Sequence, residues 1–120
     1  MFNIGCMYLN LESDLFLQIW NFCELRNLKK NKAYKSLCLN NDGKYVQFLR
    51  DLSERNSDLK EYYESIIANG DWESMGLLQD RMFNHPENYD LNDSSIQVLI
   101  TIHFLTQNDQ QKRKDPWTEN

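Results

Sequence analysis

Arg81 and His85 are the two residues whose types and spacing come nearest to a catalytic pair. They are separated by one helical turn near the end of a segment with helical periodicity, so both side chains would lie on one face of a helix. A guanidinium beside an imidazole could bind an RNA phosphodiester and transfer a proton during its cleavage. The alternative is that Arg81 is a solvated helix residue and that His85 caps a helix C-terminus, where the helix dipole favours it.

The pair is similar to the arginine–histidine motif of HEPN ribonucleases, in which more residues separate the arginine from the histidine. This resemblance implies RNA processing with Arg81 and His85 as the active residues. No Gly-rich phosphate loop accompanies the pair, and the acidic residues nearby are explained as helix starts. We therefore expect a protein that is not an enzyme and has no small-molecule substrate, with RNA processing as the alternative.

Cysteine and histidine are present but not in a metal-binding pattern. Cys6, Cys23, Cys38, His85 and His103 are widely spaced and include no close Cys-x-x-Cys pair. We expect no metal site and no cofactor, with Cys23 and Cys38 as unpaired core residues. The odd number of cysteines and the absence of a secretory signal pattern predict an intracellular protein, in the cytoplasm or nucleus.

Basic residues are densest in a short segment before residue 36. The expected basic patch contains Lys29, Lys30, Lys32 and Lys35, with Tyr34 among them. Such a patch could contact phosphates while the tyrosine stacks on a base, which makes RNA binding a further alternative. However, the net charge of −5 and the pI near 4.9 disfavour nucleic acid as a partner. The simpler interpretation is that these lysines solvate a helix end.

The surplus of aromatic and methionine side chains is the most informative signal. These residue types are enriched in the cores of protein interfaces. The expected partner-binding residues are Tyr62, Tyr63, Trp72, Met75, Met82, Phe83 and Tyr89. The alternative is that all of them pack internally. We interpret the chain as a non-enzymatic helical interaction module, such as a small viral or accessory regulatory protein, that binds a protein partner or forms a homodimer.

The stretch from Ser94 to Thr106 determines the expected fold, because it is apolar on nearly every side. Its β-branched residues alternate as in a strand, but capping residues at Asp93 and Ser94 favour a helix. No glycine or proline interrupts the chain before Lys114, so the helix could run for about five turns. The apolar run from Ile96 to Leu105 is too short for a transmembrane segment, which needs roughly 20 residues.

The remaining pattern predicts five shorter helices around this one. The expected segments are 12–28, 32–39, 44–55, 57–69 and 71 to just before Pro86, separated by turn signals such as Asn69-Gly70. The expected fold is therefore all-α, a compact bundle of about six helices around a buried C-terminal helix. The alternative is an α+β fold with a small sheet formed by the two ends of the chain.

Length and composition indicate one folded domain. The chain has 120 residues, of which 41% are hydrophobic and 26% are charged. We expect a single helical domain over residues 1–107 that begins with an apolar arm, residues 1–10. Residues 108–120 are polar and are expected to form a flexible tail, disordered beyond about Lys114.

Overall fold

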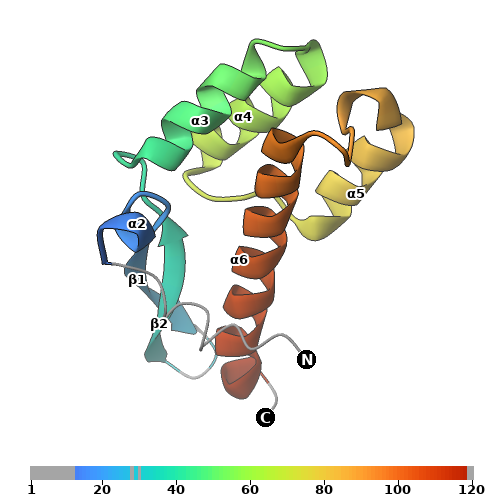
Figure 1. Ribbon diagram of the computed structural model, residues 1–120. Coiled ribbons are helices and arrows are strands. Elements are labelled where there is room, and N and C mark those ends of the chain that lie inside the picture. The colour runs from blue at the N-terminus through green and yellow to red at the C-terminus, as the bar shows by residue number, and fades with distance from the viewer. Residues whose placement is uncertain (1–12, 28, 30, 119–120) are drawn as a thin grey trace.

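The computed structural model of the protein describes residues 13–27, 29 and 31–118 (Figure 1). The expected apolar arm, residues 1–10, lies outside these residues. The elements in chain order are α2 (Ser13–Leu17), β1 (Trp20–Asn27), β2 (Lys32–Leu39), α3 (Lys44–Ser53), α4 (Ser57–Asn69), α5 (Met75–Asn84), the 3-10 helix η1 (Pro86–Asn88) and α6 (Ser94–Thr118).

The fold is α+β, so the prediction of an all-α bundle of about six helices is wrong. The segment expected to be a helix over 12–28 contains the short helix α2 and then strand β1, and the segment 32–39 is strand β2. The two strands pair in antiparallel orientation, with Trp20 opposite Leu39 and Asn27 opposite Lys32. The sheet is thus a local hairpin, and the expected alternative, a sheet made from the two chain ends, does not describe it either.

Strand β1 carries apolar side chains on both faces of the hairpin, and the loop that follows it reverses the chain. Trp20 and Phe22 share one face of β1, while Cys23 and Leu25 occupy the other face. In the loop, Asn31 has a φ of 50°, a left-handed conformation that asparagine adopts more readily than most residues. The hairpin lies beside the C-terminal half of α6 (Figure 1).

Helix α6 confirms that the stretch from Ser94 to Thr106 is helical. Its inner face is fully buried, with Ile96, Leu99, His103 and Thr106 at helical spacing. The expected burial of this C-terminal helix holds for one face and not for the other, where Phe104 is 54% exposed. The helix continues to Thr118, through most of the segment expected to be a tail. In the part of the chain that the structure describes, no helix is both long enough and apolar enough to cross a membrane.

Helices α3, α4 and α5 surround the N-terminal half of α6 (Figure 1). The predicted α4 is confirmed at both ends: the side chain of Asn56 accepts a hydrogen bond from the Leu59 main chain, and Gly70 ends the helix in the left-handed conformation. Helix α5 begins at Met75 rather than at residue 71, because the side chain of Ser74 caps it. It ends before Pro86, as predicted.

One buried hydrogen bond ties the hairpin to the helical part of the core. The indole Nε1 of Trp20 donates to Oγ1 of Thr106 over 2.8 Å, and both side chains are almost completely buried. A buried indole N–H needs such a partner, because leaving it unpaired would destabilise the fold by roughly 1–3 kcal/mol. This bond fixes the position of β1 relative to α6.

Candidate functional site

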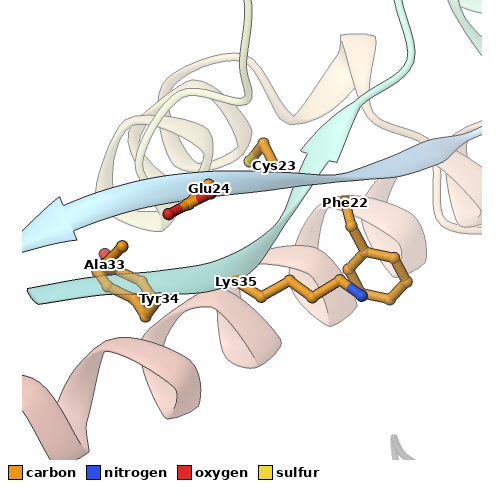
Figure 2. A pocket seen from close by; sticks show the side chains of 6 residues that line it. All are labelled: Phe22, Cys23, Glu24, Ala33, Tyr34 and Lys35. Carbon is orange, nitrogen blue, oxygen red and sulfur yellow. The ribbon is translucent and has the colours of Figure 1, made fainter.

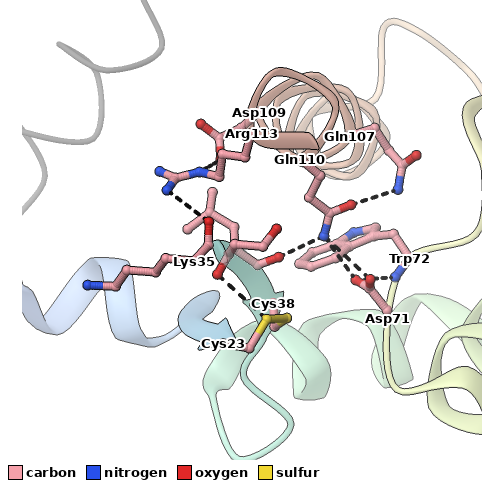
Figure 3. The surroundings of a disulfide bond; sticks show 11 residues. Cys23, Lys35, Cys38, Asp71, Trp72, Gln107, Asp109, Gln110 and Arg113 are labelled. Carbon is pink, nitrogen blue, oxygen red and sulfur yellow. Dashed lines mark hydrogen bonds and ion pairs between the residues drawn. A yellow bond between two sulfur atoms is a disulfide. The ribbon is translucent and has the colours of Figure 1, made fainter. Parts of the chain in front are cut away.

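The two edges of the hairpin are covered to different extents. Along the edge of β2, two main-chain carbonyls are bonded to side chains of α6 (Figure 3). Gln110 Nε2 donates to the Leu37 carbonyl over 2.7 Å, and Arg113 Nη1 donates to the Lys35 carbonyl over 3.4 Å. Helix α6 therefore closes the β2 edge.

Within the described part of the chain, the β1 edge is open. In an antiparallel pair, main-chain groups alternate between the partner strand and the outside. The carbonyls of Lys35 and Leu37 point outward to α6. Their partners in the register are Glu24 and Phe22, whose main-chain groups therefore point outward at the opposite edge, which belongs to β1. Arg26 continues this alternation. Among the described residues, none hydrogen-bonds to the outward main-chain groups of these three positions. Among the residues that the structure describes, this strand edge is therefore unpaired.

Two apolar side chains lie on either side of this edge. Phe22 is 46% exposed on one face of the hairpin, and Leu25 is 42% exposed on the other. The ring of Phe22 is contacted by cations from two elements, with Lys35 Nζ 4.5 Å and Arg113 Cζ 5.4 Å from the ring centroid. Each such contact contributes on the order of 0.5–1 kcal/mol at an exposed site. The cations thereby hold the ring in place while leaving half of it accessible.

A shallow pocket lies along the same part of the hairpin (Figure 2). Its volume is about 320 Å³, and its lining residues come from both strands: Phe22, Cys23, Glu24, Ala33, Tyr34 and Lys35. Figure 2 shows the Lys35 side chain extending towards Phe22. The pocket is small and open, which suits side chains of a bound chain better than a whole small molecule.

Positive charge is concentrated in the sequence segment that contains the hairpin, although the chain as a whole is acidic. Five of the 13 basic residues lie between Trp20 and Leu39, where Glu24 is the single acidic residue. Neither Arg26 nor Lys35 forms an ion pair with any residue in the described part of the chain. Arg113, in contrast, is paired with Asp109 at 2.6 Å. The two strands of the hairpin therefore carry two cations, Arg26 on β1 and Lys35 on β2, that form no ion pair with a carboxylate of the described residues.

The predicted basic patch lies on this hairpin and not at a helix end. Lys29 is in the loop, Lys32 begins β2 and Lys35 lies within β2. Lys30 lies outside the described residues. The element that carries these lysines was therefore predicted wrongly, and their role as a basic patch stays a prediction.

A disulfide bond joins Cys23 to Cys38 across the hairpin (Figure 3), with 5.9 Å between the two Cα atoms. The expectation that both are unpaired core residues is therefore wrong. The pairing of the two cysteines was not predicted from the sequence, because the hairpin that brings them together was not predicted. Disulfides persist mainly in oxidising compartments, so the intracellular location expected from cysteine usage loses that support.

The expected partner-binding residues do not form one surface. Tyr62, Trp72 and Tyr89 are buried in the core, and Tyr63, Met75 and Met82 are half-buried against it. Phe83 is the exception, since 86% of it is exposed at the end of α5. The aromatic surplus thus serves packing to a large extent.

Arg81 and His85 engage different partners. Arg81 Nε and Nη2 donate to the two carboxylate oxygens of Glu73, at 2.7 and 3.2 Å, and Nη1 lies 3.4 Å from Asp58 and Glu61. The hydrogen bond to Glu73 raises the pKa of the Arg81 guanidinium. His85 is exposed, and its Nδ1 lies 3.7 Å from Glu87. The structure does not bring this pair together as a phosphate-binding site, because three carboxylates already occupy Arg81.

The described residues contain no group of three or more side chains arranged to hold a metal ion. Comparisons with protein-family models, with curated proteins and with solved structures give no match to this chain. Its class is therefore defined by its own fold: an α+β domain in which a disulfide-linked hairpin packs on a long helix and, within residues 13–27, 29 and 31–118, leaves one strand edge open. Phe22 and Leu25 were missed as site residues, because the apolar positions in this segment, Trp20, Phe22, Cys23 and Leu25, follow no single period that could have revealed a strand edge.

Proposed function

We propose that this chain is a protein-binding module that engages its partner through the open edge of β1. The observation that carries this proposal is the row of main-chain groups at Phe22, Glu24 and Arg26 that bond to no other residue in the described part of the chain. Such an edge is a template for another strand, which gains main-chain hydrogen bonds by joining the sheet. The half-exposed side chains of Phe22 and Leu25 supply apolar surface on both sides of it.

The small size of the sheet supports the same conclusion. A two-stranded hairpin is marginally stable on its own, and this one gains support from the disulfide and from α6 along its β2 edge. A third strand would extend the sheet on its only unsupported side among the described residues. Binding and completion of the sheet would therefore be the same event.

Nucleic-acid binding by the hairpin is the second candidate function, and the unneutralised Arg26 and Lys35 favour it. It depends on base stacking by Tyr34, whose ring is half-buried. Tyr34 also lines a cavity with Gln107 and Gln110 of α6, which places α6 beside it. Retention on heparin that weakens steeply with salt and disappears in Lys35→Glu would favour this candidate.

Peptide selection tests the protein-binding proposal while the partner is still unidentified. A random peptide library is selected on the wild-type protein and counter-selected on the double variant Phe22→Ser, Leu25→Ser. Phe83→Ser is the matched control, because Phe83 is more exposed than either residue and lies on α5. We expect enriched peptides that bind wild type and Phe83→Ser equally and lose at least about tenfold in affinity for the double variant. Peptides that bind all three proteins equally, or no enrichment at all, would contradict the proposal.

A further inference from the structure

We infer that the partner contributes an extended segment with alternating acidic and apolar residues, which adds to β1 as a third strand of the sheet. This inference rests on the proposed function and specifies the chemistry and the binding mode of the ligand. Two observations support it. Main-chain groups point outward along β1 at every second residue, and the two faces of the hairpin carry different side chains beside this edge.

The main chain of β1 determines the conformation of the ligand. Outward main-chain groups recur at Phe22, Glu24 and Arg26, at every second residue. With a rise of roughly 3.3 Å per residue, this is a repeat of about 6.6 Å, which is the repeat of another β-strand. A helix has its main-chain groups bonded internally and cannot pair with such a row. The ligand is therefore extended over at least the length of residues 22–26.

The two faces of the hairpin determine which side chains the ligand carries. Successive side chains of an added strand point to opposite faces of the sheet. One row of ligand side chains lies beside Phe22, on the face where Lys35 and Arg26 supply positive charge. The other row lies beside Leu25, on the face that carries the Cys23–Cys38 disulfide. Carboxylates suit the first row and apolar side chains suit the second.

Glu24 provides an internal check on this assignment. Its side chain lies on the same face as Phe22, directly opposite Lys35 in the register, and no basic group within the described residues pairs with it. It therefore repels an acidic ligand. Replacing it with glutamine removes the repulsion and keeps the shape, so Glu24→Gln should bind the ligand about two- to fivefold more tightly, in line with 0.2–1 kcal/mol for an exposed charge pair.

The test uses a fluorescein-labelled eight-residue peptide of alternating Glu and Val, with binding measured by fluorescence anisotropy. Three matched probes accompany it: the same peptide with N-methylated Glu residues, a Lys–Val peptide of the same length, and a single-stranded oligonucleotide of the same net charge. We expect the Glu–Val peptide to bind and each of the three other probes to bind at least about tenfold more weakly. N-methylation removes amide hydrogens from the ligand and leaves the protein unchanged, so this comparison does not depend on any variant folding.

Protein variants locate the binding to the edge. Glu24→Pro removes an outward N–H but no hydrogen bond to β2, because Glu24 and Lys35 are not a hydrogen-bonded pair of the ladder. We expect it to lose binding while Glu24→Gln gains it, with circular dichroism and thermal unfolding as checks on folding. Amide hydrogen exchange provides an independent readout in the wild type. Addition of peptide should slow exchange at Glu24 or Arg26 and leave Ser36, which faces β1 within the hairpin, unchanged.

The outcomes separate this inference from the proposed function. If selected peptides depend on Phe22 and Leu25, but N-methylation and Glu24→Pro have no effect, the module binds protein and the third-strand inference is wrong. If the oligonucleotide binds as tightly as the Glu–Val peptide, the edge recognises polyanions in general and the inference is again overturned. If neither selected peptides nor the Glu–Val peptide respond to the Phe22→Ser, Leu25→Ser variant, both proposals fail.

Discussion

The hydroxyl of Tyr62 lies 2.6 Å from Nδ1 of His103, and this contact joins α4 to α6 in the interior of the protein. Tyr62 is 1% exposed and His103 is 0% exposed. Burial lowers the pKa of the His103 imidazole to about 4, and the nearby main chain of Glu73 opposes this effect in part. The imidazole is therefore neutral in the folded protein at physiological pH, and it can accept a hydrogen bond from the tyrosine hydroxyl.

Acidification should destabilise the protein through His103. In the unfolded chain this histidine has a pKa near 6.5, and in the folded protein its pKa is about 4. Between these values the unfolded state binds the proton and the folded state does not, so the free energy of unfolding falls as the pH drops from 6.5 to 4. We expect a loss of up to about 3 kcal/mol over this range, measured by urea unfolding at several pH values.

The two histidines of the chain provide a matched pair of variants for this measurement. His103→Gln should unfold at lower urea concentration at pH 7.5, because it changes a buried hydrogen bond, and its stability should depend less on pH between 6.5 and 4. His85→Gln removes an exposed histidine and should keep the wild-type pH dependence. Equal pH dependence in wild type and His103→Gln would show that other groups cause the effect.

Arg81 should be a major determinant of stability, because it neutralises buried carboxylates. The side chain of Glu73 is 2% exposed and that of Asp58 is 8% exposed, and both are paired with Arg81. Arg81→Met would leave these carboxylates without a cation, which typically destabilises a protein by about 3–5 kcal/mol. Urea unfolding measures this loss, and the further change Glu73→Gln in the same chain should restore part of it.

The exposed ion pair between Arg55 and Asp93 is the control for this prediction. Its atoms lie 2.7 Å apart, but the two side chains are 45% and 33% exposed. Arg55→Met should therefore change the free energy of unfolding by less than about 1 kcal/mol. If Arg55→Met and Arg81→Met destabilise the protein to the same extent, burial does not explain the role of Arg81.

Helices α3, α4 and α6 were predicted from the sequence because their signals are local. The glycine at position 70 acts within one turn of α4, and α6 follows a capping cluster that includes Asp93. The hairpin could not be predicted in the same way. Leu15, Ile19 and Phe22 have helical spacing, and their actual structure depends on contacts that are distant in sequence. The bond between Trp20 and Thr106, for example, spans 86 residues.

The candidate site was less predictable than the fold. The lysines at 29, 32 and 35 lie on the hairpin of the candidate site, but the open edge is a property of strand pairing, and no single residue type marks it. The expected aromatic surface failed to assemble for a related reason. Residues such as Tyr62 and Tyr89 are equally suited to interfaces and to cores, and only the packing of α4, η1 and α6 shows that these two belong to the core.

The disulfide should stabilise the protein considerably. It connects two strands over a sequence separation of 15 residues, and closing a loop of that size in the unfolded chain is worth about 3 kcal/mol. Cys38→Ala should therefore lower the free energy of unfolding by a similar amount, and Cys6→Ala is the control because the disulfide joins the other two cysteines.

Alkylation in denaturant should modify one cysteine without reductant and three after reduction. Modification of all three without reductant would show that the bond is not formed.

The close approach between α3 and the loop before β1 predicts opposite effects for two glycine substitutions. A Cβ at Gly43 would overlap the main-chain carbonyl of Gln18, which accepts a hydrogen bond from the Tyr45 N–H over 2.9 Å. Gly43→Ala should therefore force these segments apart and lower the free energy of unfolding by about 1–3 kcal/mol. A Cβ at Gly76 in α5 would meet only Ser74 Oγ, at 3.9 Å, so Gly76→Ala should be neutral or stabilise the protein by up to about 1 kcal/mol through its helix propensity. Thermal and urea unfolding of both variants measure these changes in the free energy of unfolding. A Gly43→Ala variant as stable as the wild type would mean that the loop before β1 and α3 are not in contact as described.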